Sequence, residues 1–316
     1  MKPVMRRSRR VSSFAAACVL SLLLAAPVRA AEPPAAAAAG AGSIDLYVRK
    51  AGSGPRGEAE GFKSFALDTL PLEEVKHRDV QYESVVRVRG IRLAALISRY
   101  APPPATDVAI LHFANGMAVP LPFRDGTLMK RLDPFVARAL VAEPGAPAPD
   151  GFPPISRRVE NYVDVRPIVF TGNKLAVADR MHPDVPEKHR AVFSPWTYVD
   201  SLRSIEFVSG SAYYRQFDLD PASHDGFVVF SQSCQFCHGA RKGGASLGWD
   251  FVEPEPIVNI KRSPRALFFH VRYRGRTDQI NGAQMPALTH VDEEDARKLH
   301  GWLKALADKD TPEYAP

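Results

Sequence analysis

The stretch FSQSCQFCHGA, residues 230–240, contains two cysteines three positions apart and a histidine directly after the second. On a helical turn, residues three and four apart share one face, so Cys234, Cys237 and His238 are expected to project together. This pattern is typical of c-type haem attachment, in which two thiols bind the porphyrin and the imidazole binds the iron. It predicts one covalent haem c on Cys234 and Cys237, with His238 as the proximal iron ligand.

Other interpretations of the cysteine pair are weaker. A structural zinc site needs four ligands and usually a second cysteine pair, and the one further cysteine, Cys18, lies near the start of the chain. A redox dithiol of the thioredoxin type is expected in a βαβ context, which the flanking sequence lacks. A chance occurrence of the spacing is the remaining alternative.

Residues 1–30 have the layout of a secretory signal peptide. Basic residues without any acid precede an apolar run, and Val28-Arg29-Ala30 forms a small-x-small cleavage pattern. The pair Arg9-Arg10 fits a twin-arginine leader less well, and Cys18 is poorly placed for a lipoprotein site. We expect a periplasmic mature chain that begins near Ala31.

The charge balance changes when this leader is removed. The whole chain has 41 basic and 35 acidic residues, but six of the basic ones lie in the leader, which has no acid. The mature chain is then formally neutral, which favours neither nucleic acid nor an anionic membrane as a partner. No second apolar run is long enough to span a bilayer. The expected partner is a periplasmic redox protein.

Two globular regions are expected after the leader. Residues 31–43 are rich in Ala, Pro and Gly and predict a flexible linker. Residues 44–214 mix strand and helix patterns without a βαβ rhythm, which predicts an α+β domain. From 215 to 316 the sequence predicts helices and long loops, hence an all-α domain, with the boundary between Tyr214 and Pro221.

Local patterns predict the elements of the first region. Alternating Val and Arg indicate a strand, apolar spacing before the prolines indicates a helix, and Asn-Gly suits a type I′ hairpin. The expected elements are a strand around 86–89, a helix over 93–100, a hairpin turning at Asn115-Gly116, a helix opened by Asp133-Pro134, a second hairpin turning at Gly172-Asn173, and a closing strand at 201–208.

Three helices are expected around the cysteine motif. The first ends at the motif and carries Gly226 and Phe230; the last begins after Asp292 and carries Leu299 and Trp302. A glycine lets two helices approach closely, so Phe230 is expected to pack on Leu299 and Trp302. The middle helix, 264–273, begins with an N-cap serine and a first-turn proline.

One methionine, Met285, follows the motif. A soft thioether suits the sixth position of an electron-transfer haem and raises its potential, so Met285 is the predicted distal ligand. The rival sixth ligand is His270, which is expected on the helix 264–273.

Taken together, residues from about 221 to 308 resemble a class I cytochrome c domain. That family is a small all-helical fold that holds one haem c and transfers single electrons. Its members usually carry a proline after the motif whose carbonyl fixes the proximal histidine. Here no proline follows until Pro254, so the sequence does not identify the partner that orients His238.

The first region is similar in its order of elements to the molybdopterin-binding domain of the sulfite oxidase family. The similar stretches are RGIRLAALI, HFANGMAVPLPF, PIVFTGNKLAVAD and PWTYVDSLRSIEFV. That family holds its metal through a cysteine thiolate, and residues 44–214 contain no cysteine. We therefore expect a scaffold for docking or ligand binding without molybdopterin. An unrelated α+β domain is the alternative.

These expectations converge on a periplasmic monohaem c-type cytochrome that carries electrons and is not itself an enzyme. Alternatives are a molybdopterin-dependent oxidoreductase with a fused haem c domain and a haem-based sensor. A group of basic residues could steer an acidic partner or could form an ordinary solvated face. These residues are Lys261, Arg262, Arg265, Arg272, Arg274 and Arg276.

Overall fold

The structure of the chain is a computed structural model. It describes residues 43–49, 59–79, 84–141, 169–170, 202–215, 217, 221–241, 243–273, 285, 288 and 290–308. All of these residues belong to one unit of the chain, residues 37–316. The expected leader, the linker up to residue 42 and the turn at Gly172-Asn173 lie outside the described residues.

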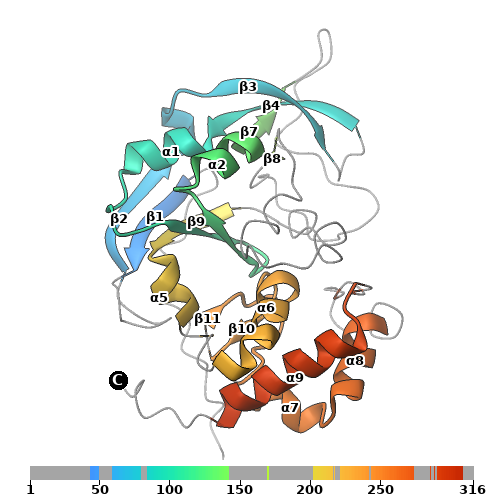
Figure 1. Ribbon diagram of the computed structural model, residues 1–316. Helices are drawn as coiled ribbons and strands as arrows, with labels where there is room; N and C mark the ends of the chain where they lie inside the picture. Colours follow the sequence, from blue (N-terminus) through green and yellow to red (C-terminus); the bar gives the residue numbers. More distant parts are fainter. Residues whose placement is uncertain are drawn as a thin grey trace, which may run out of the picture. The chain divides into compact units, whose positions relative to one another are not determined.

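The larger sheet has the strand order β2-β1-β9-β5-β6. Figure 1 labels three of its strands, β1, β2 and β9. Its strands are β1 (Ser43–Arg49), β2 (Ala59–Ala66), β5 (Val108–Phe113), β6 (Ala118–Pro122) and β9 (Leu202–Val208). The expected closing strand is thus confirmed as β9, in the middle of the sheet, parallel to β1 and antiparallel to β5. This central strand is mostly buried, and its buried residues include the charged Glu206.

The smaller sheet has the order β3-β4-β7-β8. Its strands are β3 (Glu73–Asp79), β4 (Ser84–Arg92), β7 (Pro134–Leu140) and β8 (Val169–Phe170). The strand expected around 86–89 is confirmed within β4. The helix expected after Asp133 is wrong, because residues 134–140 pair with β4. Asp133 instead ends the preceding helix in a left-handed conformation, with φ 42°.

Two short helices and a 3-10 turn accompany these sheets: η1 (Leu67–Thr69), α1 (Leu93–Tyr100) and α2 (Gly126–Leu132). Helix α1 confirms the helix expected over 93–100, and its predicted apolar face is buried. It ends at Ala101, which has φ 57°, directly before the prolines. Asp125 caps α2 by accepting a hydrogen bond from the Leu128 amide at 2.9 Å.

The hairpin expected at Asn115-Gly116 is confirmed, since β5 and β6 pair antiparallel on either side of it. Its turn is not of type I′, because only Gly116 has a positive φ, +86°. Asn115 instead accepts a hydrogen bond from the Met117 amide through its side chain, at 3.1 Å. The side-chain bond replaces the second left-handed residue that a type I′ turn would need.

Helices and two short strands follow after residue 209. They are α5 (Gly210–Arg215), η3 (Pro221–Ser223), α6 (His224–Ser233), β10 (Gly239–Ala240), β11 (Gly243–Gly244), α7 (Ile257–Ile260), α8 (Pro264–Tyr273) and α9 (Glu293–Asp308). The expected caps are present: Ser263 Oγ accepts from the Ala266 amide, and Asp292 Oδ1 accepts from the Asp295 amide.

The predicted fold class, an α+β domain followed by an all-α cytochrome c domain, is wrong. The described residues form mixed sheets and helices, and strands β10 and β11 pair antiparallel inside the segment that was expected to be all-helical. The hairpin forms because two residues adopt positive φ angles: Arg241 in the turn, with φ 54°, and Gly244 in β11, with φ 92°. Glycines at three of the four strand positions hid this pairing from a reading based on side-chain patterns.

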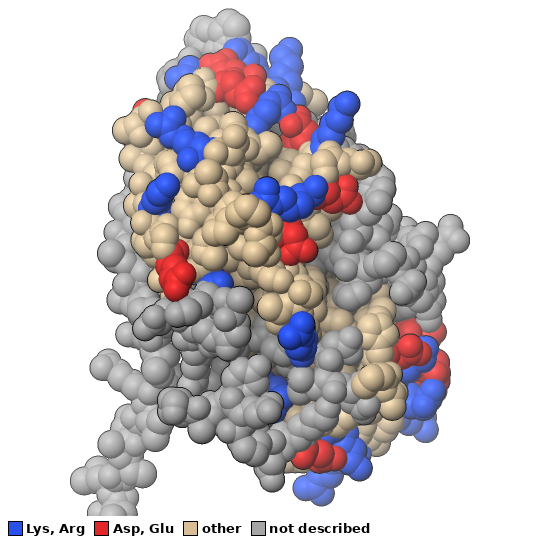
Figure 2. Space-filling model, turned by 60° about the vertical axis from the view of Figure 1, so that its left-hand side comes forward, with Lys and Arg blue, Asp and Glu red and all other residues tan. Residues whose placement is uncertain are grey.

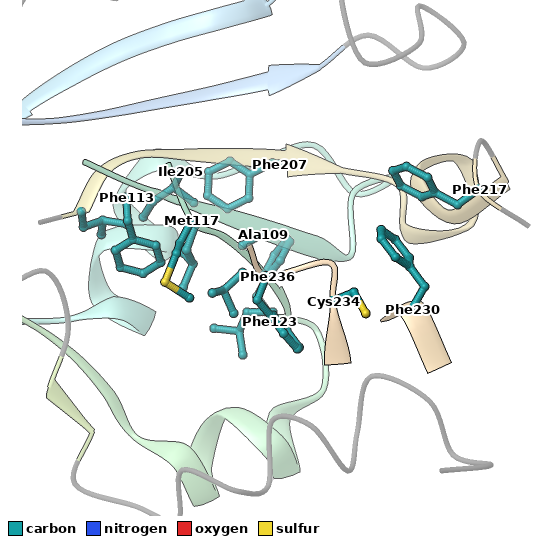
Figure 3. Close-up of a cluster of buried hydrophobic side chains, with 14 of the residues drawn as sticks. Ala109, Phe113, Met117, Phe123, Ile205, Phe207, Phe217, Phe230, Cys234 and Phe236 are labelled. Atoms are coloured by element: carbon teal, nitrogen blue, oxygen red, sulfur yellow. The ribbon is translucent and has the colours of Figure 1, made fainter. Parts of the chain in front are cut away.

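One hydrophobic cluster includes residues from both expected regions. Phe207 of β9 and Phe123 after β6 belong to it, as do Phe230 of α6, Cys234 and Phe236 (Figure 3). The larger sheet and the cysteine motif therefore bury side chains in a common core.

Candidate functional site

The cysteine motif continues the hydrogen bonding of α6 for one further turn. The Cys234 amide donates to the Phe230 carbonyl at 2.8 Å, and the His238 amide donates to the Cys234 carbonyl at 2.9 Å. The second bond spans four residues, as in an α-helix. This turn brings together Cys234, Cys237 and His238, as their spacing in the sequence predicts.

Both thiols are free and shielded from solvent, Cys234 more so than Cys237. Burial raises the pKa of Cys234 to about 12, and the nearby Cys237 adds to the rise. Burial also raises the pKa of Cys237 to about 11. At neutral pH both groups are neutral thiols, whereas a reactive dithiol or a zinc site uses thiolates.

The imidazole of His238 is oriented by a backbone carbonyl. Its Nδ1 lies 2.8 Å from the carbonyl oxygen of Trp249. A carbonyl oxygen can only accept, so Nδ1 carries the proton and donates it. In the neutral ring Nε2 then carries no proton, which is the form in which a histidine nitrogen ligates a metal.

Gly248 lets the chain approach the flat face of this imidazole. A methyl group added at Gly248 would lie 2.3 Å from Cε1 and 2.5 Å from Nδ1 of His238. The Gly248 amide donates to the Cys237 carbonyl at 2.7 Å, which keeps the loop against the motif. Phe251 stacks on the imidazole, with ring centroids 4.5 Å apart and an interplanar angle of 28°. The ring is therefore held by packing as well as by its hydrogen bond.

Asp250 holds the loop that carries these contacts. Its Oδ1 accepts hydrogen bonds from the amides of Arg241, Val252 and Glu253, at 3.0, 2.8 and 3.0 Å. The Phe251 amide donates to the Gly239 carbonyl at 2.9 Å. One carboxylate thus ties both ends of the loop together and fixes the carbonyl of its neighbour, Trp249.

The helix pair beside the motif packs at Gly226. A methyl group there would lie 2.1 Å from the Lys298 carbonyl oxygen and 2.5 Å from Trp302 Cβ, so α6 and α9 cross at this glycine. Phe230 meets Trp302 with ring centroids 4.8 Å apart, and Leu299 is buried beside them in the same cluster. Trp302 Nε1 donates to the Phe217 carbonyl at 2.9 Å. The expected packing of Phe230 against Trp302 is present.

Met285 is partly buried against the same hydrophobic cluster that contains Cys234. Residues 274–284 and 286–287, on either side of it, lie outside the described residues. Its role as the distal iron ligand therefore stays a prediction. The rival ligand His270 lies in the last turn of α8, as expected.

Sequence reasoning missed Gly248, Trp249, Asp250 and Phe251. Trp249 acts through its backbone carbonyl and Gly248 through the absence of a side chain, so their residue types do not indicate these roles. The signal that could have found them is the run GWDF itself, an acid between two aromatics directly after a glycine. An aspartate in a loop commonly accepts from nearby amides and so fixes the loop.

A second buried polar group lies on the larger sheet. Glu206 of β9 accepts from the guanidinium of Arg49 on β1 and lies 2.8 Å from Nε2 of His112 on β5. Tyr47 Oη is 3.4 Å from the same carboxylate. We call these four residues the Glu206 cluster. Burial alone would raise the pKa of Glu206. The hydrogen bonds and charges of His112 and Arg49 outweigh this effect and lower the pKa to about 2.

No group of three or more His, Cys, Asp or Glu side chains within the described ranges is arranged to hold a metal ion. No known protein-family model matches the chain. No curated protein sequence matches it either.

The helices of the described segments are all too short or too polar to cross a membrane.

The expected basic group is only partly described, since Arg274 and Arg276 lie outside the described residues. Arg272 donates to the Val291 carbonyl at 3.2 Å, and Arg265 lies over the Phe269 ring at 5.6 Å. On the face drawn in Figure 2, basic and acidic side chains are interspersed with uncharged surface. Steering of an acidic partner by these residues stays a prediction.

Proposed function

We propose that this chain is a monohaem c-type cytochrome that transfers single electrons in the periplasm. Cys234 and Cys237 would bind the porphyrin covalently, and His238 would ligate the iron. The observation that carries the proposal is the hydrogen bond from His238 Nδ1 to the Trp249 carbonyl. The hydrogen bond places the proton on Nδ1, so that Nε2 is the metal-binding nitrogen, on the same turn as the buried thiol of Cys234 and the partly buried thiol of Cys237.

The residues present fit a covalently held haem. Thioether bonds leave both sulfurs uncharged, which suits positions where burial disfavours a thiolate. Haem iron supplies reversible one-electron chemistry when it is bound. The chain's own contribution is to fix the imidazole through Trp249, Gly248 and Phe251 and to exclude water by the packing of α6 against α9.

Met285 is the proposed distal ligand. Its thioether is a soft donor on a side chain that packs against the core containing Cys234. The resemblance of the motif residues to the class I cytochrome c family supports this assignment, although the all-α fold class does not hold.

Residues 44–214 are proposed to bind a partner or ligand rather than a molybdenum cofactor. The cysteine thiolate that holds the metal in the similar sulfite oxidase fold has no counterpart in residues 44–214. Metal analysis of the protein purified from its own periplasm tests this point. Stoichiometric molybdenum would overturn this part of the proposal.

The decisive experiment is the intact mass of protein matured with a haem-ligation system. The wild-type chain should gain the mass of one haem, and the Cys234→Ser/Cys237→Ser double variant should gain none. An unmodified wild-type mass would refute the haem assignment. In the ferric protein, Met285→Ala should abolish the near-infrared charge-transfer band of methionine ligation, while His270→Ala should leave it in place.

A further inference from the structure

The turn between β5 and β6 is hydrogen-bonded directly to the loop behind the haem motif. The Gly116 carbonyl accepts from the amides of Ser246 and Leu247, at 2.8 and 3.1 Å. From the other side, the Ala118 amide donates to the carbonyl of Phe236, at 3.1 Å. The larger sheet thus holds both the motif and the loop that follows it by backbone bonds.

This contact leaves no room for a side chain at Gly116. A methyl group there would lie 2.8 Å from the Leu247 amide nitrogen and 3.0 Å from the Ser246 carbonyl carbon. Both neighbours are backbone atoms, which cannot rotate away as the end of a flexible side chain could. Any added atom must therefore displace residues 246–247, or the turn must open.

Phe236 anchors the motif to the sheet from within the haem-attachment sequence itself. It is one of the two residues between the cysteines, and its side chain is fully buried. It lies in the same group of buried side chains as Ala109, Met117 and Phe123, which come from β5 and the segments around β6 (Figure 3). A residue that the motif leaves unspecified thus fixes where the motif docks.

The hydrogen bond between Gly116 and Leu247 lies within two residues of the groups that contact the His238 imidazole. Leu247, which donates to Gly116, is followed by Gly248 against the imidazole face and by Trp249, whose carbonyl accepts from Nδ1. We infer that the turn from Asn115 to Ala118 is a positioning element for His238, and that Gly116 is a positioning residue for the iron ligand. The inference rests on the proposed haem function.

A shift of residues 246–247 should change the electronic character of the ligand. The Nδ1–H···O bond makes the imidazole a stronger donor, and a stronger donor stabilises ferric iron. Weakening that bond therefore raises the reduction potential. The turn between β5 and β6 then forms part of the haem site, although in the sequence it lies more than a hundred residues before the motif.

Gly116→Ala in the full-length haem protein tests this inference, with Gly126→Ala as the matched control. A methyl group at Gly126 meets nothing within 4 Å. Gly116→Ala should retain its haem mass, raise the reduction potential and speed exchange of the His238 Nδ1 proton measured by NMR. Gly126→Ala should leave the potential and the proton exchange at their wild-type values.

Asn115→Ala is the second variant, in case Gly116→Ala does not fold. It removes the side-chain oxygen that accepts from Met117 and loosens the same turn without adding an atom. It should raise the potential in the same direction by a smaller shift. Wild-type potential and proton exchange in the folded turn variants would overturn the inference, whereas a wild-type chain without haem mass would overturn the proposed function.

Discussion

The loop around His238 and the Glu206 cluster are held together by different kinds of hydrogen bond. In the loop, each bond described above has a backbone group as donor, acceptor or both: the Trp249 carbonyl, the amides that Asp250 accepts from, and the Gly248 amide. In the Glu206 cluster every one of them joins two side chains, from strands β1, β5 and β9.

The difference determines which conditions and substitutions each region tolerates. A backbone carbonyl does not titrate, so the orientation of His238 depends on the path of the loop rather than on the charge of its acceptor. The Glu206 cluster depends on a buried charge, and a buried charge that loses its partners is costly. The loop should therefore be sensitive to changes of shape, and the cluster to changes of charge.

Glu206→Gln should have the largest effect on the free energy of unfolding. The lowered pKa of Glu206 means that its carboxylate stabilises the fold by about 3 kcal/mol. This contribution is present above the ordinary pKa of 4.5 and is lost as the pH falls towards about 2. Urea denaturation of the wild type and the variant at several pH values measures it, and the difference between the two should shrink below pH 4.5.

The control for this change is Glu74→Gln. Glu74 also pairs with two arginines, Arg87 and Arg89, but it lies at the surface. Exposed ion pairs contribute little, so this variant should match the wild type. Equal losses from the two variants would contradict the distinction between buried and exposed charge.

Asp250→Ala should have the next largest effect. Three amides lose a charged acceptor, which costs about 2 kcal/mol in total once water replaces some of the bonds. Asp250→Asn keeps one acceptor oxygen and should lose less. Thermal or chemical denaturation ranks the two variants, and equal losses would show that the charge of Asp250 matters more than the oxygen that accepts the hydrogen bonds.

Gly248→Ala should have a smaller effect on stability and a clear effect on His238. The added methyl group overlaps the imidazole, so the ring or the loop must shift at a cost of about 1–2 kcal/mol. The reduction potential should rise as the bond to Trp249 lengthens. Gly301→Ala on α9, where a methyl group meets nothing within 4 Å, should leave the potential unchanged.

Trp249→Ala should have the smallest effect on stability, because only the carbonyl of Trp249 is used and its side chain is 74% exposed. Surface substitutions of this kind usually change stability by less than about 0.5 kcal/mol. The potential should stay close to that of the wild type. A large change in potential would mean that the indole itself, and not the loop path, controls His238.

Local patterns predicted much of the fold. The helices α1, α8 and α9 followed from apolar spacing and from caps such as Ser263 and Asp292, which act within one turn. Strand β7 was missed because Asp133-Pro134 serves equally as a helix start and as the end of the helix before it. Pairing with β4, more than forty residues earlier, decided between the two.

The candidate site was predictable only in part for the same reason. Cys234, Cys237 and His238 lie within five consecutive residues, so their spacing identifies them. Glu206 meets Arg49 and His112 across 157 and 94 residues, which no local pattern reveals. The carbonyl of Trp249 is close in sequence to His238, but every residue has a carbonyl, so residue type carries no information about it.

The burial of the motif places a constraint on the order of biogenesis. Cys234 is 3% exposed and Phe236 is fully buried against the larger sheet. An enzyme that joins haem to both thiols would therefore have to act before the chain has folded completely. We expect a thiol-alkylating reagent to label Cys234 early in refolding of the haem-free chain and to lose access later, and equally fast labelling of the folded chain would contradict this order.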